Sequence, residues 1–211
     1  STATYSLNAN SASIELNVDT TADAEVIRET TRVFAYQPGK SLQILTTFVM
    51  NEAKENLRQR VGYFSTQNGI FLEQDGTTIN IVKRSFSNSS IVETKAEQST
   101  WNIDPLDGTG PSLKTLDLSK AQIFFTDIEW LGVGTVRSGF VIDGSLIHCH
   151  SFHHANEVTD AYMTTACLPV RYEIKNTAET ANNSTFKQIC STVISEGGYS
   201  PTGKKFSVGY S

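Results

Sequence analysis

The chain has 211 residues, enough to bury a substantial core within one β-domain or two small domains. Only 18% of the residues are charged, and the net charge is −5. Because phosphate binding needs clustered Lys and Arg, this charge excludes nucleic acid from the partners that we expect. No apolar run approaches the roughly 20 residues that a membrane-spanning helix needs, so we expect no membrane insertion.

The N-terminal residues are mostly polar. Ser1–Asp19 is rich in Ser, Thr and Asn, and within it Ser13–Val18 alternates apolar and polar residues, which predicts an arm or an edge strand. Ala22–Arg32 is ambiguous, because its β-branched residues make it a poor helix. We therefore expect residues 1–33 to form an N-terminal arm or edge strand.

Strands dominate the next part of the chain. Ser41–Met50 has apolar residues on both faces and predicts an inner strand. A meander follows, because Asn68-Gly69 and Asp75-Gly76 are hairpin signals that separate three strand-like segments. These segments are Arg60–Ser65, Ile70–Gln74 and Thr77–Ser87. Residues 88–110 are polar and rich in Gly, Pro and Asp, which predicts a long connection.

The stretch from residue 121 to 152 is the clearest block of antiparallel strands. Gly132-Val133-Gly134 and Asp143-Gly144 are turn signals that divide it into Ala121–Leu131, Thr135–Asp143 and Ser145–Phe152. Further strands are predicted at Leu168–Ile174 and Phe186–Ser195.

Together these signals predict an all-β fold. We expect an antiparallel β-sandwich of jelly-roll type with about nine to eleven strands and little helix, since turn signals recur at intervals of roughly 8–12 residues. A single sandwich domain is expected to span residues 34–195, and residues 196–211 are expected to be a C-terminal extension.

All four histidines fall within His148–His154. On a regular strand His148 and His150 share a face, a spacing that zinc sites use, and His154 lies near. Structural zinc needs four ligands, however, and no second ligand pair occurs in the sequence. We therefore expect imidazoles that hydrogen-bond locally and no metal or other cofactor, with His148, His150 and His154 as the weak metal candidates.

Asp127 and Glu129 form the one carboxylate pair that merits weighing as a catalytic site. At positions i and i+2 of a strand they share a face, at a spacing compatible with glycoside hydrolysis. Two solvent-facing acids at the end of a strand explain the pattern equally well. We expect no enzyme, and a glycan hydrolase that uses these two residues stays the further alternative.

Aromatic residues raise another alternative, a carbohydrate-binding module. Its stacking surfaces for sugar rings would be Trp101, Trp130, Tyr162 and Tyr172. Core burial is the commoner fate of such side chains. The three cysteines, Cys149, Cys167 and Cys190, are too few for a disulfide framework and predict free thiols.

A series of uncommon segments runs along the chain from about Phe34 to Ile174. The segments are Tyr36-Gln37-Pro38-Gly39-Lys40-Ser41, Arg60-Val61-Gly62-Tyr63-Phe64, Asn68–Gly76, Trp101-Asn102, Leu106–Ser112, Thr115–Leu118, Asp127, Trp130–Gly134, Val136-Arg137, His150, Phe152, His154-Ala155-Asn156, Tyr162-Met163 and Leu168–Ile174. Their order resembles a pattern in uncharacterised virion structural proteins of tailed bacteriophages, especially marine and cyanobacterial ones.

The resemblance implies a setting more than a chemistry. It implies a structural component of a phage virion, in the tail, fibre or capsid surface, that is made in the host cytoplasm. Long strands with exposed edges are an aggregation hazard in a monomer, so we expect a homo-oligomer, a trimer as the first hypothesis. Other virion proteins and a host-surface glycan are the further partners that this setting suggests.

Overall fold

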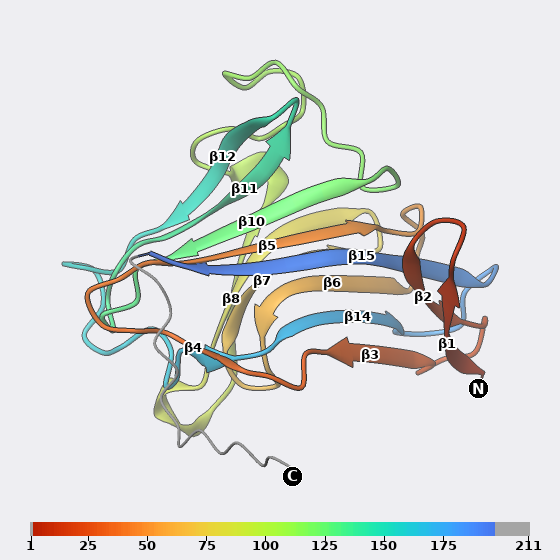
Figure 1. The fold of residues 1–211 in the computed structure, drawn as a ribbon, viewed down its shortest axis with the longest axis horizontal. Coiled ribbons are helices and arrows are strands. Elements are labelled where there is room, and N and C mark those ends of the chain that lie inside the picture. The colour runs from red at the N-terminus through yellow and green to blue at the C-terminus, as the bar shows by residue number, and fades with distance from the viewer. Residues whose placement is uncertain (1, 197–211) are drawn as a thin grey trace, which may run out of the picture.

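The computed structural model describes residues 2–196, apart from the side chain of Asn88, and shows two β-sheets packed face to face (Figure 1). Every strand pair in this part is antiparallel. Its only helices are two short 3-10 turns, Ser87–Ser89 and Gln98–Thr100. The predicted antiparallel β-sandwich with little helix is therefore confirmed. Of the predicted C-terminal extension, all but Glu196 lies outside the described residues.

The first sheet has seven strands in the order β1-β2-β15-β5-β10-β11-β12. Their bounds are β1 Ala3–Asn8, β2 Ser13–Val18, β15 Ser184–Ser195, β5 Leu42–Val49, β10 Gln122–Ile128, β11 Val136–Ile142 and β12 Ser145–Phe152. The predicted three-strand block from residue 121 to 152 is thus one side of this sheet. Its tight turn at Asp143-Gly144 has positive φ at both residues, as the Asp-Gly signal predicts.

The second sheet has six strands in the order β3-β14-β6-β7-β8-β9. Their bounds are β3 Glu25–Glu29, β14 Val170–Asn176, β6 Leu57–Phe64, β7 Gly69–Asp75, β8 Thr78–Ser85 and β9 Val92–Glu97. The predicted meander corresponds to β6, β7 and β8. A separate two-stranded pair joins β4 (Phe34–Ala35) to β13 (Cys167–Leu168).

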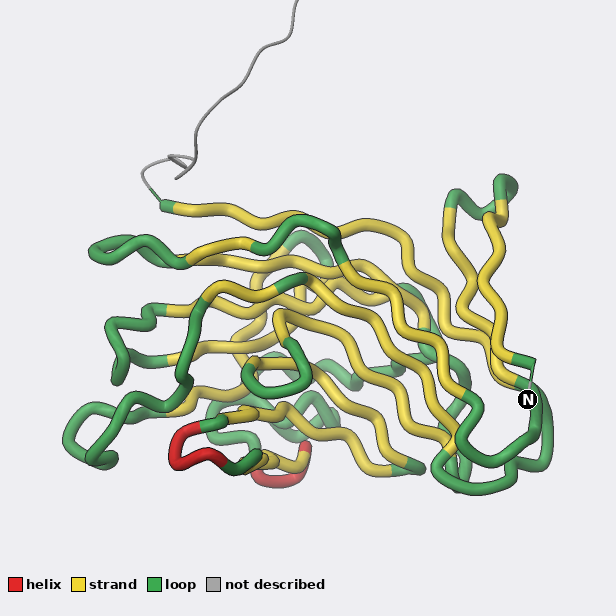
Figure 2. Tube along the Cα trace, turned by 90° about the horizontal axis from the view of Figure 1, so that it is seen from below, coloured by secondary structure: helices red, strands yellow, loops and turns green. Residues whose placement is uncertain are grey.

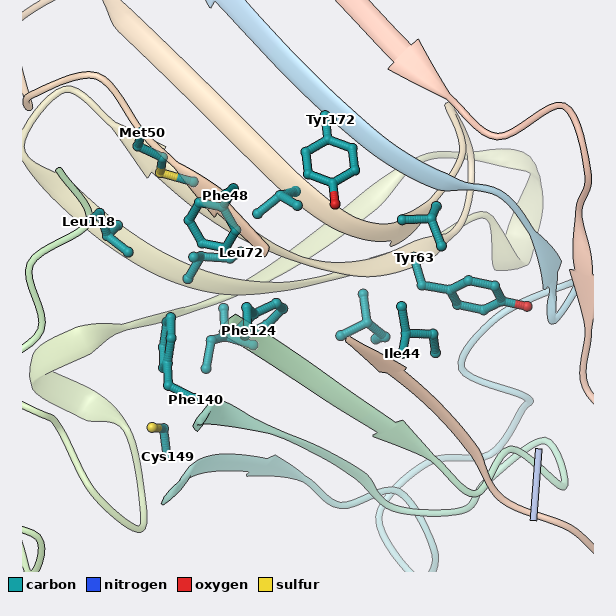
Figure 3. Close-up of a cluster of buried hydrophobic side chains, with 14 of the residues drawn as sticks. Ile44, Phe48, Met50, Tyr63, Leu72, Leu118, Phe124, Phe140, Cys149 and Tyr172 are labelled. Atoms are coloured by element: carbon teal, nitrogen blue, oxygen red, sulfur yellow. The ribbon is translucent and has the colours of Figure 1, made fainter. Parts of the chain in front are cut away.

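The core lies between the two sheets, where alternate side chains of each strand point inward (Figure 3). Phe48 of β5 and Phe124 of β10 come from the first sheet, and Leu72 of β7 and Tyr172 of β14 come from the second. Each is at most 1% exposed. Burial of one such side chain stabilises the fold by about 1.5–3 kcal/mol, so this layer supplies most of the driving force for folding.

The structure has fifteen strands in its described part, more than the nine to eleven predicted. The additional strands are short or polar: β1, β3, β4, β9 and β13. β1, β3 and β9 lie at sheet edges, where one neighbour is missing and polar side chains reach water. These strands lack the apolar alternation of a half-buried strand, so their pattern resembled a loop.

Residues 2–33 contribute to both sheets. β1 is an edge strand of the first sheet and β3 an edge strand of the second, whereas β2 lies between β1 and β15. Ser13–Val18, expected as an arm or edge strand, is therefore an inner strand with Leu16 and Val18 in the core. The β1–β2 hairpin stands away from the body of the sandwich at the end that holds the N-terminus (Figure 2).

Candidate functional site

Asp127 and Glu129 lie together on the outer face of the seven-stranded sheet. Asp127 is the penultimate residue of β10, and Glu129 follows the strand. One guanidinium nitrogen of Arg137 lies 3.3 Å from Asp127 Oδ2 and 2.9 Å from Glu129 Oε1. The prediction that the two carboxylates share a face is confirmed, and the structure adds the cation that joins them.

Register explains why Arg137 is there. Asp127 pairs with Arg137 on β11 and with Gln43 on β5, and Gln43 pairs in turn with Ile194 on β15. These four residues form one outward-facing row across four strands, because directly paired residues point to the same side of a sheet. Arg137 and Gln43 give no signal of this site in the sequence, since only the pairing register brings them beside Asp127.

A hollow of about 290 Å³ opens at this row. Ser41 and Glu196 close one end of it, and the Ser41 hydroxyl donates to Glu196 Oε2 at 3.0 Å. The hollow is lined by Ser41, Gln43, Asp127, Ile194 and Glu196. It therefore combines two carboxylates, an amide and a hydroxyl with one apolar side chain.

Burial and hydrogen bonding shift the pKa values of two groups at the site, Asp127 and Arg137. It raises the pKa of the Asp127 carboxyl above its ordinary value, although Arg137 opposes this. Hydrogen bonding to Glu129 raises the pKa of Arg137, so the guanidinium stays charged. The site therefore places one guanidinium cation between the carboxyl groups of Asp127 and Glu129.

The same face becomes apolar toward the other end of the strands. Phe125 is only 5% exposed although it points away from the main core. Its ring lies over Gly139, where an added Cβ would approach Phe125 Cε1 to 2.9 Å. The His148 ring lies beside it, with 6.0 Å between ring centroids. The face thus passes from charged residues at Asp127 to an aromatic and apolar surface at Phe125.

The histidines do not gather at one place. Gly139 pairs with His148 and the adjacent Ser138 pairs with His150, so Cys149 is the extra residue of a β-bulge. His148 therefore points outward and His150 inward, and the expectation that they share a face is wrong. Among residues 2–196 no group of three or more His, Cys, Asp or Glu is placed to hold a metal ion.

His154 lies in a third environment. Its ring stacks on Tyr162 with centroids 3.9 Å apart, and its Nδ1 lies 2.7 Å from the Gly134 carbonyl oxygen. Its Nε2 lies 3.0 Å from the Lys83 ammonium. This histidine is therefore fixed by local hydrogen bonds.

Three of the four aromatic residues considered for sugar stacking belong to the core, and the fourth packs against it. Trp101 is 5%, Tyr162 4% and Tyr172 1% exposed. Trp130 is half-buried, packs against the core and meets Tyr36 edge-on. Trp101 donates its indole N–H to Ala96 O, and Tyr172 its hydroxyl to Cys190 O. None of the three buried rings has a free face for a sugar, so their assignment to stacking is wrong in this structure.

Cys149 is buried, whereas Cys167 and Cys190 are exposed, and all three are free. Burial raises the pKa of the Cys149 thiol to about 12. No helix in the described part of the chain is long and apolar enough to cross a membrane.

Comparison with known proteins bears on the fold. No protein-family model matches the chain, and no curated protein matches its sequence. Among solved structures, a GH16 protein of Bacteroides ovatus, solved with a product of mixed-linkage glucan, has a TM-score of 0.56 at 8% identity. The match covers 91% of this chain and 85% of that one.

Two further structures are similar. A β-1,3-1,4-glucanase (lichenase) from a mouse hindgut metagenome has a TM-score of 0.52 at 14% identity, covering 90% of this chain and 81% of that one. The binding domain of botulinum neurotoxin serotype G has a TM-score of 0.47 at 10% identity, covering 92% of this chain but only 41% of that one. The two glucan-related structures confirm the predicted jelly-roll type of sandwich, and identities this low speak for the fold alone.

Proposed function

We propose that this protein is a carbohydrate-binding module whose site is the hollow at Asp127. The observation that supports the proposal is the chemistry of the lining. Carboxylate, amide and hydroxyl groups supply the acceptors and donors that sugar hydroxyls need, and Ile194 offers an apolar surface for C–H groups. A concave site with a few convergent polar groups is the usual form of a small-molecule site.

The same geometry argues against hydrolysis. A retaining glycosidase needs one carboxylate that is free to attack and another that holds a proton. Here one nitrogen of Arg137 contacts both Asp127 and Glu129, so each carboxylate is held as an ion-pair partner. We therefore propose a binding protein rather than an enzyme.

The first ligand to test is a mixed-linkage β-glucan oligosaccharide. Two solved structures share this fold with a TM-score above 0.5. One is described with a product of that glycan, and the other is a β-1,3-1,4-glucanase. The choice of probe rests on that likeness of fold, and a broad glycan array extends the test to other sugars.

Asp127→Asn tests the site. The substitution keeps the shape of the side chain but removes the charge that accepts sugar hydroxyls, so we expect at least a tenfold loss of affinity by calorimetry. Thr47→Ala on the same face, four residue pairs further along β5, is the matched control and should bind as the unchanged protein does. Equal affinity in both variants would exclude the hollow, and glucan cleavage by the unchanged protein would show an enzyme instead.

A second candidate function is that of a structural component of a phage particle, as the sequence resemblance implies. A specific observation favours assembly: β1 is an edge strand whose side chains are exposed on both faces, with Tyr5 74% and Leu7 72% exposed. Sedimentation velocity should then show a homo-oligomer, a trimer by our hypothesis, that Tyr5→Ser combined with Leu7→Ser dissociates. A monomer at all concentrations would contradict this candidate.

A further inference from the structure

A second hollow, of about 390 Å³, lies between the six-stranded sheet and the loop at 157–162, and it shares no lining residue with the hollow at Asp127. One wall comes from β8, β9 and the turn between them, and the other from the loop at 157–162. Five of its side chains carry hydroxyl groups on aliphatic carbons: Ser85, Ser87, Ser90, Thr94 and Thr159. The proposed function above does not use any of them.

Lys83 brings a positive charge to this hollow. It pairs with Thr94 of β9, and its half-buried side chain reaches under the loop. The ammonium lies 5.4 Å from the ring centroid of Phe152 and 5.9 Å from that of Tyr162. No carboxylate among residues 2–196 lies within ion-pair distance of Lys83, in contrast to most cations of the second sheet.

The neighbour of Lys83 is neutral. A carbonyl oxygen only accepts, so the contact between His154 and Gly134 O places the proton of the ring on Nδ1. His154 Nε2 is then an acceptor for the Lys83 ammonium at 3.0 Å. Stacking on Tyr162 holds the ring in this position. The histidine accepts one hydrogen bond but leaves the charge of Lys83 unbalanced.

A half-buried ammonium without a counter-ion is costly, because burial removes part of its hydration. Burial also lowers the pKa of Lys83, while the nearby Glu157 opposes this without forming an ion pair. An anionic group of a ligand that enters the hollow would supply the missing charge and accept the remaining N–H groups of the ammonium.

We propose that this hollow binds an acidic sugar, with the sugar carboxylate on Lys83 and the sugar hydroxyls on the Ser and Thr side chains. The exposed Glu157 and Asp160 at the rim fit the same ligand, because carboxylates accept hydrogen bonds from sugar hydroxyls. They also repel anions that carry several charges, so a phosphate is a poorer ligand than a monocarboxylate with many hydroxyls.

The test is a titration of the full chain with sodium D-galacturonate, followed by NMR of the backbone amides. D-galactose is the matched neutral sugar and inorganic phosphate the matched anion. We expect galacturonate alone to shift the amides of β8, β9 and residues 154–162. The same shifts with galactose, stronger binding of phosphate, or no shifts at millimolar galacturonate would overturn the proposal.

Two variants locate the binding. Lys83→Met keeps an unbranched side chain of similar length but removes the charge, and should weaken galacturonate binding at least tenfold. Thr94→Trp, at an exposed position of the lining, should block the hollow without touching the Lys83–His154 contact. Asp127→Asn should leave galacturonate binding unchanged, which separates this hollow from the site of the proposed function. Retained affinity in both Lys83→Met and Thr94→Trp would contradict the proposal.

Discussion

The two outer faces of the sandwich use charge in different ways. On the six-stranded sheet, charged side chains form a continuous set of ion pairs, which we call the charged lattice. Its arginines are Arg58, Arg60, Arg84 and Arg171, and its other members are Lys95, Glu29, Glu73, Glu93 and Glu173. On the seven-stranded sheet, Arg137 serves Asp127 and Glu129 beside an open hollow.

The charged lattice covers a small apolar cluster of its own. Phe64, Phe71 and Val82 are 0% exposed, although they lie outside the main core. The Arg84 guanidinium lies 5.6 Å from the Phe64 ring centroid and 4.9 Å from that of Phe71. Arginine thus shields aromatic rings from water with its planar face while its edge binds carboxylates.

The difference lies in how many partners inside the protein each charged group has. Arg84 donates to Glu93 through Nε and one terminal nitrogen, and to Ser65 O through the other. All three of its guanidinium nitrogens donate inside the protein, so Arg84 is poorly suited to capture a ligand. Asp127 instead shares its one ion-pair partner with Glu129 and lines a hollow. We infer that the charged lattice stabilises the fold and that the face at Asp127 is the one fitted for recognition.

The largest effect that we expect comes from breaking the charged lattice. Glu73 is completely buried and binds Arg60 Nε at 2.7 Å and Lys95 Nζ at 2.6 Å. Glu73→Gln removes the charge and leaves Arg60 buried without its main partner, which should cost about 3–5 kcal/mol of unfolding free energy. Urea denaturation followed by circular dichroism measures the loss.

The matched control is Asp143→Asn, which breaks an exposed ion pair with Lys114. Exposed pairs contribute little because water and salt screen them, so the denaturation midpoint should hardly move. If Glu73→Gln behaved like this control, the charged lattice would not be a source of stability, and the contrast between the two faces would fail.

The sequence was sufficient for most of the fold and for little of the site. β5, β10, β11 and β12 have apolar alternation or tight-turn residues, which are local signals. β9 has the sequence VETKAE, in which only Ala96 is buried, so its strand character depends on pairing with β8. Edge strands of this kind are decided by their neighbours, and no local pattern reveals them.

Two residue pairs with the same spacing in sequence, Asp127 with Glu129 and His148 with His150, differ in whether their side chains share a face. Asp127 and Glu129 share a side because β10 is regular at Asp127. His148 and His150 have the same spacing, but the bulge at Cys149 turns them to opposite faces. Lys83 gave no signal at all, since a lysine at an inward position of β8 looks like any surface lysine until the loop at 157–162 is placed over it.

The smallest expected effect is a difference in the sign of pH dependence on the two faces. Burial alone would raise the pKa of Glu93, but Arg84, Arg60 and Lys95 outweigh it and hold that pKa below its ordinary value. Glu93 therefore contributes stability that is present above its unfolded-state pKa and is lost as the pH falls through the lowered one. Asp127 behaves oppositely: with its pKa raised, its contribution is greatest below the unfolded-state value and is lost as the pH rises through the raised one.

Carbon-detected NMR of the side-chain carboxyl groups gives both titrations in one experiment. Glu93 should titrate below, and Asp127 above, the value of the same residue type in an unfolded peptide. Glu93→Gln should flatten the acid side of the stability profile, and Asp127→Asn should remove the decline that accompanies ionisation of Asp127. If both carboxyl groups titrated with lowered pKa, Arg137 would hold Asp127 as firmly as the charged lattice holds Glu93. The face at Asp127 would then be a second stabilising ion cluster, and the two faces would not differ in how they use charge.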